Sequence, residues 1–184
     1  MVLRSVTPQD QAFVDALYAS TRDDLMPLGG DAGFLLQLIK MQQQTQMAGF
    51  ALLFPGAVHQ LIEITGLPGE PAASPEPVGR VVVHSSPTDL RLLDIAVMPG
   101  HRRAGIGKSV LLALQHSARA QGLGMSLAVS KTNHAARQLY LAHGFGVSSE
   151  DALFEQMSWQ PTATALPQKL HAAGFIDQTG LLRD

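Results

Sequence analysis

The chain has 184 residues and a formal net charge of −2, with 46% hydrophobic and 15% charged residues. This length and composition indicate one compact domain rather than a disordered chain, and the charge argues against a protein that mainly binds the nucleic-acid backbone. The sequence has no cysteine, which excludes disulfides and thiolate metal sites, and without a signal peptide or a bilayer-length apolar stretch we expect a cytoplasmic protein with no membrane partner.

The first predicted elements are a strand, a helix and a loop. Residues 2–6 read as a short strand, and Thr7 followed by Pro8 is typical of a helix start. We expect this helix to reach about Ser20. Residues 21–31 contain proline and glycine and are predicted to be a loop.

A second helix is expected over residues 32–46, with its apolar side facing the core and its glutamines facing solvent. The residues placed inside are Phe34, Leu35, Leu38, Ile39 and Met41, and those placed outside are Gln42, Gln43 and Gln44.

Two strands follow, over residues 59–65 and 78–85, and the second is rich in β-branched residues. The segment 66–77 between them holds four prolines and two glycines, which predicts a long hairpin loop. Residues 90–98 form the third strand of this series.

The apolar pattern of this third strand changes parity part-way. Leu90 and Leu92 share one face, whereas Leu93, Ile95 and Val97 share the other. A strand buried on both faces would give this pattern, and so would a β-bulge.

The next segment is predicted to be a βαβ unit. A glycine turn leads into a helix that reaches about Gln121 and ends at Gly122 or Gly124, and a strand follows over residues 125–129. This order makes the strands 90–98 and 125–129 parallel. The predicted buried stripe of the helix consists of Ile106, Val110, Leu111, Leu114 and Ala118.

A short helix after Asn133, closed by Gly144 and Phe145, and a last strand over residues 152–159 complete the predicted core. The boundaries that we expect are a single domain over residues 1–159 and a C-terminal extension over residues 160–184. Within the extension, residues 166–173 are predicted to form a short helix that packs on the domain or on a second copy of the chain. The alternative for this tail is a loosely attached terminus.

The glycine turn is a candidate anion site. Gly105 and Gly107 stand at a helix start, where backbone N–H groups lack intrahelical partners, and Arg102, Arg103 and Lys108 lie beside them. A diphosphate suits such a set of donors. The spacing fits neither the P-loop nor the dinucleotide fingerprint, and the alternative for the three cations is a solvated basic patch.

Two motifs resemble the GNAT family of N-acetyltransferases. The order Arg102-x-x-Gly105-x-Gly107 resembles the loop that binds the pyrophosphate of acetyl-CoA in that family. The segment that begins at Asn133, has Tyr140 seven residues later and ends at Gly144-Phe145 resembles its cofactor and general-acid segment. The resemblance implies a mixed α/β fold with a mostly antiparallel sheet, whose parallel βαβ unit splays apart at the cofactor cleft.

The resemblance also implies roles for particular residues. Tyr140 would protonate the departing CoA thiolate, and Asn133 would hydrogen-bond the pantetheine arm. The backbone of Ile95, Ala96 and Val97 would pair with pantetheine as if it were another strand. The residues that would bind the rest of acetyl-CoA are Arg102, Arg103, Ala104, Gly105, Ile106, Gly107 and Lys108. The alternative for Tyr140 is a buried core tyrosine.

No residue of the sequence matches the family's usual general bases. Ala128 stands where many members have glutamate, and Arg91 and Leu93 occupy two further base positions. We therefore expect no indispensable base; the proton would leave through water to Asp94, Glu63 or His84. The alternative for Asp94 is a structural role rather than a catalytic one. Arg91, if it faced the cleft, could pair with a carboxylate of the acceptor.

The function that these residues predict is acetyl transfer from acetyl-CoA to a primary amine of a small molecule or peptide. The competing interpretations are a non-catalytic acyl-CoA-binding regulatory module and, less well supported, a nucleotide-binding domain. The seven histidines include no pair at i and i+4, so no metal site is expected. Self-association into a homodimer is a further expectation.

Overall fold

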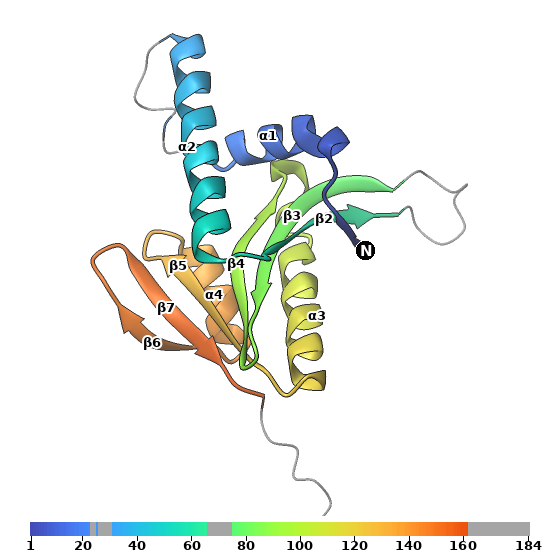
Figure 1. Ribbon diagram of the computed structural model, residues 1–184, viewed down its shortest axis with the longest axis vertical. Helices are drawn as coiled ribbons and strands as arrows, with labels where there is room; N and C mark the ends of the chain where they lie inside the picture. The colour runs from blue at the N-terminus through green and yellow to red at the C-terminus, as the bar shows by residue number, and fades with distance from the viewer. Residues whose placement is uncertain (23–24, 26–30, 66–74, 162–184) are drawn as a thin grey trace, which may run out of the picture.

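The computed structural model describes residues 1–22, 25, 31–65 and 75–161. Figure 1 shows a seven-stranded sheet with helices on both faces. The strands are β1 (Val2–Ser5), β2 (Val58–Ile64), β3 (Glu76–Ser85), β4 (Asp89–Val97), β5 (Gly124–Ser130), β6 (Gly146–Glu150) and β7 (Phe154–Trp159). The helices are α1 (Gln11–Ala19), α2 (Ala32–Leu53), α3 (Ile106–Ala120) and α4 (His134–Ala142), with 3₁₀ turns at Pro8–Asp10 and Pro99–His101.

The sheet is mostly antiparallel, as the resemblance implied. Its strand order is β1-β2-β3-β4-β5-β7-β6, and β4 and β5 form the parallel pair. After α4 the chain forms the edge strand β6 and then turns back as β7, which pairs with β5 on one side and with β6 on the other. The turn after α4 begins at Gly144 with φ +83°, a left-handed conformation that glycine adopts without steric cost.

The start of the chain is fixed by local polar contacts. Thr7 and Asp10 form a reciprocal capping box, in which the Asp10 carboxylate accepts from the Thr7 backbone N–H at 2.7 Å. The Arg4 guanidinium binds the same carboxylate at 2.9 Å and Glu63 of β2 at 2.8 Å. These contacts attach the first strand and helix to the sheet edge.

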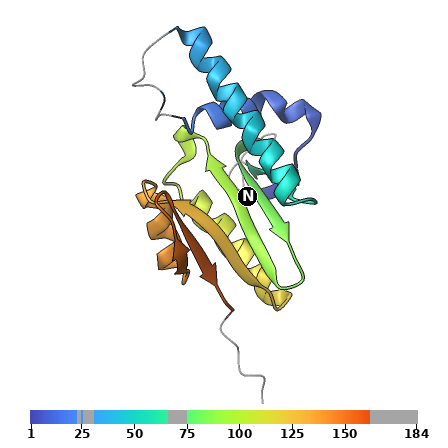
Figure 2. The same ribbon diagram turned by 60° about the vertical axis from the view of Figure 1, so that its left-hand side comes forward.

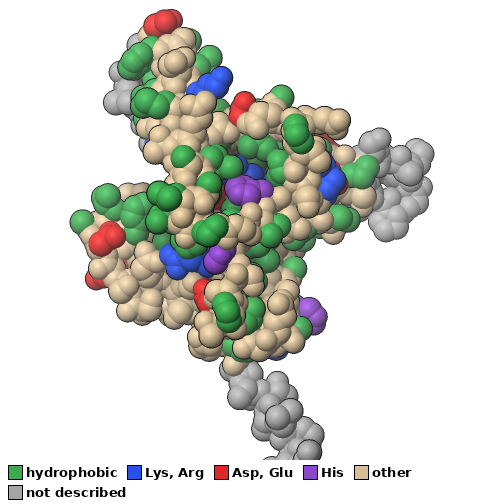
Figure 3. Space-filling model, viewed as in Figure 1, with side chains coloured by type: hydrophobic (Ala, Val, Ile, Leu, Met, Phe, Trp, Pro, Cys, Tyr) green, Lys and Arg blue, Asp and Glu red, His purple; other side chains and the backbone are tan. Residues whose placement is uncertain are grey.

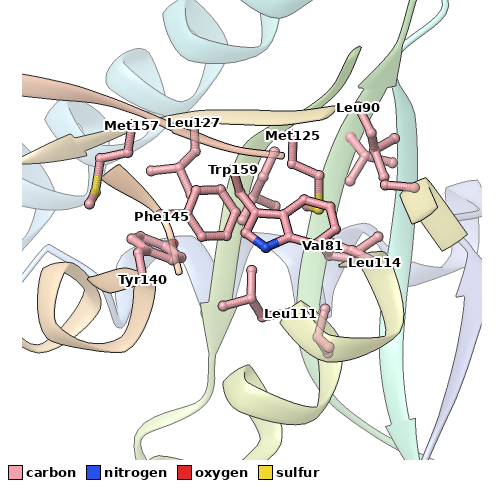
Figure 4. Close-up of a cluster of buried hydrophobic side chains, with 14 of the residues drawn as sticks. Val81, Leu90, Leu111, Leu114, Met125, Leu127, Tyr140, Phe145, Met157 and Trp159 are labelled. Carbon is pink, nitrogen blue, oxygen red and sulfur yellow. The ribbon is translucent and has the colours of Figure 1, made fainter. Parts of the chain in front are cut away.

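The main core lies between the sheet and α3 and α4. Figure 4 shows side chains from β5 and β7 packed over Leu111 of α3, and Tyr140 beside Phe145. The predicted stripe of α3 is largely confirmed: Val110, Leu111, Leu114 and Ala118 are buried, whereas Ile106 is half-buried. The opposite face of the sheet carries α1 and α2, as a comparison of Figures 1 and 2 shows.

Helix α2 differs from its prediction in length and orientation. It continues to Leu53 because Met47–Leu53 are mostly good helix formers, and Pro55 then stops it. Phe34 and Met41 were expected inside, but they are 65% and 57% exposed. Gln43 was expected outside, but it is buried, and its amide donates to Asp15 of α1 at 2.9 Å.

Two further differences concern strands. Strand β6 is not among the strands predicted from the sequence, because its five residues are all exposed and give no core-facing alternation. Strand β3 begins at Glu76, two residues earlier than expected. The predicted helix over residues 166–173 lies outside the described residues, as does most of the predicted loop 66–77. None of the described helices is both long and apolar enough to cross a membrane.

Neighbouring leucines of α3 offer a matched test of the core. Leu111 is fully buried, whereas Leu112 is 45% exposed. We expect Leu111→Ala to lower the free energy of unfolding by about 2–5 kcal/mol, because it leaves a cavity. Leu112→Ala should change it by no more than about 0.5 kcal/mol. Urea denaturation of both variants measures the difference, and equal losses would contradict this account of the core.

Candidate active site

A β-bulge in β4 opens the centre of the sheet. Val82 of β3 pairs with Asp94, but the next residue, Val83, pairs with Leu92, so Leu93 is the extra residue. The bulge is one of the two explanations that the parity change allowed, and the structure confirms it. Parallel pairing of β4 with β5 ends at Leu92 and Leu127, although both strands continue. Beyond this point the edge of β4 that faces β5 has no strand partner among the described residues.

A cavity lies between the separated strands. Its walls come from residues 92–95 of β4, residues 127–130 of β5, the α4 N-cap Asn133, and Ala136 and Tyr140 of α4. A cleft between splayed strands was expected from the resemblance.

The glycine turn forms the next part of the site. Arg103 and Gly105 both have left-handed backbone conformations, with φ of 64° and 81°. The N–H groups of residues 103–108 donate to no backbone oxygen in the described part of the chain, and they surround the N-terminus of α3. Successive free N–H groups at a helix start form an anion site.

A cavity of about 510 Å³ lies directly against this turn. Its lining residues are Val97, His101, Arg102, Arg103, Gly105, Ile106, Gly107, Lys108, Ala135, Ala136 and Leu139. Ala136 also lines the cavity between the splayed strands, so the two cavities adjoin.

The three cations of the turn are not equivalent. Arg102 donates from Nε to the carbonyl of Val97 and from Nη2 to the carbonyl of Ser20, each at 2.9 Å. It therefore joins the end of β4 to the end of α1. Arg103 and Lys108 are exposed and form no ion pair within the described residues, so their charges face the cavity and solvent.

Asn133 stands where several cavities meet. Its Oδ1 accepts from the Ala136 N–H at 3.1 Å and so caps α4. The residue lines the cavity between the strands, a second cavity beside residues 95–97, and a further cavity that lies under α1. The cap fixes the side-chain oxygen and leaves the amide N–H₂ as the group for a ligand.

Tyr140 is 6% exposed, and its ring packs against Phe145 at 5.8 Å between centroids. It also lines the cavity between the strands. Burial, and to a lesser extent the negative charge of Asp94, raise the pKa of Tyr140 to about 12. The phenol is therefore protonated at neutral pH and can donate a proton into the cleft.

Asp94 lies between the cleft and the face that carries α1 and α2. It lines the cavity between the strands and the cavity under α1, where Arg80, Gln46 and residues of α1 also lie. Arg80 Nη2 donates to its carboxylate at 2.6 Å. Arg80 is not among the functional residues predicted from the sequence, although an arginine inside the valine-rich run of β3 is itself a signal.

Glu63 and His84, the other two predicted proton acceptors, lie outside these cavities, and so does Arg91, the predicted partner of an acceptor carboxylate. Glu63 binds Arg4, and His84 packs against Phe54 with ring centroids 5.5 Å apart. Arg91 donates to Ser126 Oγ at 3.1 Å and to Gln156 Oε1 at 2.9 Å, and it stacks over Phe54. None of the three lines the cavities described above.

A family model described as the acetyltransferase (GNAT) family matches residues 30–145, which is more than half of the chain. The chain belongs to this family. It is therefore an acetyltransferase enzyme, and acetyl-CoA is its acetyl donor. No curated protein sequence matches the chain.

Solved structures of GNAT enzymes share the fold. PaiA N-acetyltransferase from Thermoplasma acidophilum, in complex with coenzyme A, has a TM-score of 0.60 at 15% identity over 87% of this chain and 98% of that one. An acetyltransferase from Thermus thermophilus has a TM-score of 0.57 at 17% identity over 88% and 98%. A spermidine N-acetyltransferase variant from Vibrio cholerae has a TM-score of 0.57 at 17% identity over 87% and 95%.

The raised pKa of Tyr140 can be measured in this GNAT enzyme. We expect ultraviolet titration to show a phenol phase near pH 12, and Tyr140→Phe to remove the Tyr140 contribution to that phase. Because the folded pKa exceeds the ordinary value of 10, the buried phenol stabilises the fold below pH 10, and this contribution is lost as the pH rises toward 12. Asp94→Asn should lower the pKa part of the way, since burial is the larger cause. A Tyr140 phase at pH 10 would contradict the burial.

Proposed function

We propose that this acetyltransferase transfers the acetyl group of acetyl-CoA directly to a primary amine of a small molecule or a peptide. The observation that carries the proposal is the adjoining pair of cavities that leads from the free N–H groups of residues 103–108 to Tyr140 between the splayed strands. Direct transfer needs donor and acceptor in one site, where positioning supplies much of the rate.

The residues of the site suit the parts of acetyl-CoA. In this proposal the diphosphate binds the backbone of Arg103, Ala104, Gly105, Ile106, Gly107 and Lys108. The left-handed Gly105 supports this fit, because a Cβ there would meet nothing within 4 Å and would point into open space. Arg103 and Lys108 add positive charge, while Arg102 holds the turn in place through its two backbone carbonyls.

The pantetheine arm is proposed to run along the unpaired edge of β4 at Ile95–Val97, with the Asn133 amide donating to it. An extended chain with amide groups can pair with a free strand edge as another strand would. Acetyl-CoA supplies the thioester, and Tyr140 then faces its sulfur.

The proton balance assigns a role to Tyr140. A C–N bond to the acceptor replaces the C–S bond of the thioester, so the amine loses a proton and the sulfur gains one. The Tyr140 phenol is proposed to donate that proton, since its raised pKa keeps it protonated at neutral pH. The amine proton is proposed to leave through water without an indispensable base, and Asp94 is the one carboxylate among the described residues that line these cavities.

Replacing Tyr140 tests this role. We expect Tyr140→Phe to lower kcat by about 10²–10⁴-fold, the usual range for a general acid. Acetyl-CoA binding, measured by calorimetry, should stay within about twofold, because the ring and its packing remain. Unchanged kcat in Tyr140→Phe would remove the acid role and leave a core tyrosine.

Two glycines with the same backbone conformation test the cofactor site. Gly105 and Gly122 have φ of 81° and 69°, and a Cβ would meet nothing within 4 Å at either position. Valine at either position is strained by about 1–3 kcal/mol, so both variants should melt at lower temperature. Gly105→Val alone should lose acetyl-CoA binding, because Gly122 lies at the other end of α3. If both variants bind as the parent does, the phosphate site is misplaced.

Several expectations from the sequence stay predictions. They are the domain boundary at residue 159, the homodimer and the cytoplasmic location.

A further inference from the structure

The cavity under α1 opens onto the reacting centre from the face opposite α3 and α4. Its volume is about 210 Å³, and it is lined by Asp94, Ile95, Ala96 and Asn133 of the cleft. The remaining walls are Leu17, Tyr18, Thr21, Arg22, Gln46 and Arg80. An acceptor that enters here would meet Asp94 next to the splayed strands, which makes this cavity a candidate route for the amine to the thioester.

Arg80 forms part of this wall with an incompletely satisfied guanidinium. The residue is 3% exposed. Its Nη2 donates to Asp94 at 2.6 Å, whereas among the described residues its Nη1 meets only the Met47 sulfur at 3.6 Å and its buried Nε has no partner. A thioether is a weak acceptor, and a buried guanidinium normally satisfies its donors with oxygen atoms. The side chain therefore has donors that an anionic oxygen could use.

The other side of Arg80 is lined by no carboxylate among the described residues. It borders a second cavity of about 520 Å³, lined by Val6, Thr7, Pro8, Gln11, Val14, Gln43, Met47, His59 and Arg80. No carboxylate stands among these residues. Burial, and then the charge of Arg80, lower the pKa of His59, so its imidazole is neutral near pH 7 and Arg80 is the cation of the cavity. Figure 3 shows basic and histidine side chains gathered on this face, beside α2.

Acceptor groups for an amine lie on the same wall. Within the described part of the chain, the second oxygen of Asp94 accepts no hydrogen bond and the buried Gln46 Oε1 has no partner. Asp94 is the one carboxylate among the described residues that line the cavity, and Arg80 already neutralises it. A polyamine, which needs several carboxylates, would therefore be poorly matched here.

We infer that the acceptor is an amine with its own carboxylate a few bonds away, as in a free amino acid. Its amino group binds Asp94 and Gln46 in the cavity under α1, and its carboxylate binds the Arg80 guanidinium, which lines the same cavity. Because Arg80 and Asp94 are joined by a hydrogen bond of 2.6 Å, the two groups of the acceptor must lie close together. The inference rests on the proposed function and adds the class of amine to it.

Paired acceptors test the inference with the native enzyme. Thiol release from acetyl-CoA would be measured with a panel of free amino acids, with the corresponding amino-acid amides, and with spermidine. We expect kcat/KM to be at least about tenfold higher for the acids than for their amides, since a hydrogen bond to a charged partner is at stake. Spermidine should be a poorer substrate than the acids.

Arginine variants test the assigned residue. Arg80→Lys should lower kcat/KM for the acids by about tenfold or more and reduce the preference over the amides, because lysine lacks the planar fork. Arg91→Lys is the matched control and should leave the preference unchanged, since Arg91 bonds Ser126 and Gln156. If Arg80→Lys fails to fold, the ratio of acid to amide in the native enzyme decides the question.

The outcomes separate this inference from the proposed function. Thiol release with amides or spermidine at rates equal to or above those of the acids would overturn the inference and leave the N-acetyltransferase intact. Absence of thiol release with every amine, in enzyme that binds acetyl-CoA by calorimetry, would overturn the proposed function and the inference with it.

Discussion

The site depends on one interruption of backbone pairing, the bulge at Leu93. A single additional residue in β4 ends the parallel ladder with β5 at Leu92 and Leu127. Unpaired backbone groups inside a sheet are costly unless a ligand or water satisfies them, so the fold keeps at its centre an edge that a bound molecule can complete. The glycine turn after β4 and the cap of α4 lie beside this opening, and three cavities lined by residues of these elements meet there.

Much of the βαβ region could be predicted, because its signals are local. Gly122, one of the two glycines predicted to end α3, has the left-handed conformation typical of that position, and the bulge is one of the two explanations that the parity change in residues 90–98 allowed. Cap residues and glycines act within a few positions of themselves, so the sequence contains what decides them.

The regions that were missed depend on contacts distant in sequence. Gln43 is buried because Asp15 of α1 accepts its amide, a partner that periodicity does not show. Strand β6 forms because β7 offers it a ladder, although none of its residues is buried. Arg80 was overlooked for the same reason, since its ion pair with Asp94 crosses from β3 to β4. The predicted base positions gave no candidate, and the structure places Arg91 among Ser126, Gln156 and Phe54 instead of in the cavities.

The order of the chain also separates the two halves of the proposed site. Leu17, Gln46 and Arg80, which line the cavity under α1, all precede Asp94, whereas the turn at 103–108 and Tyr140 follow it. Substitutions in the first half can thus reshape one cavity without altering the glycine turn. Arg102 and Asn133 are the exceptions, because the Arg102 bond to the Ser20 carbonyl joins the halves and Asn133 lines cavities of both. In evolutionary terms, acceptor preference can diverge while the donor site is retained, and Arg102 marks the contact at which such divergence is constrained.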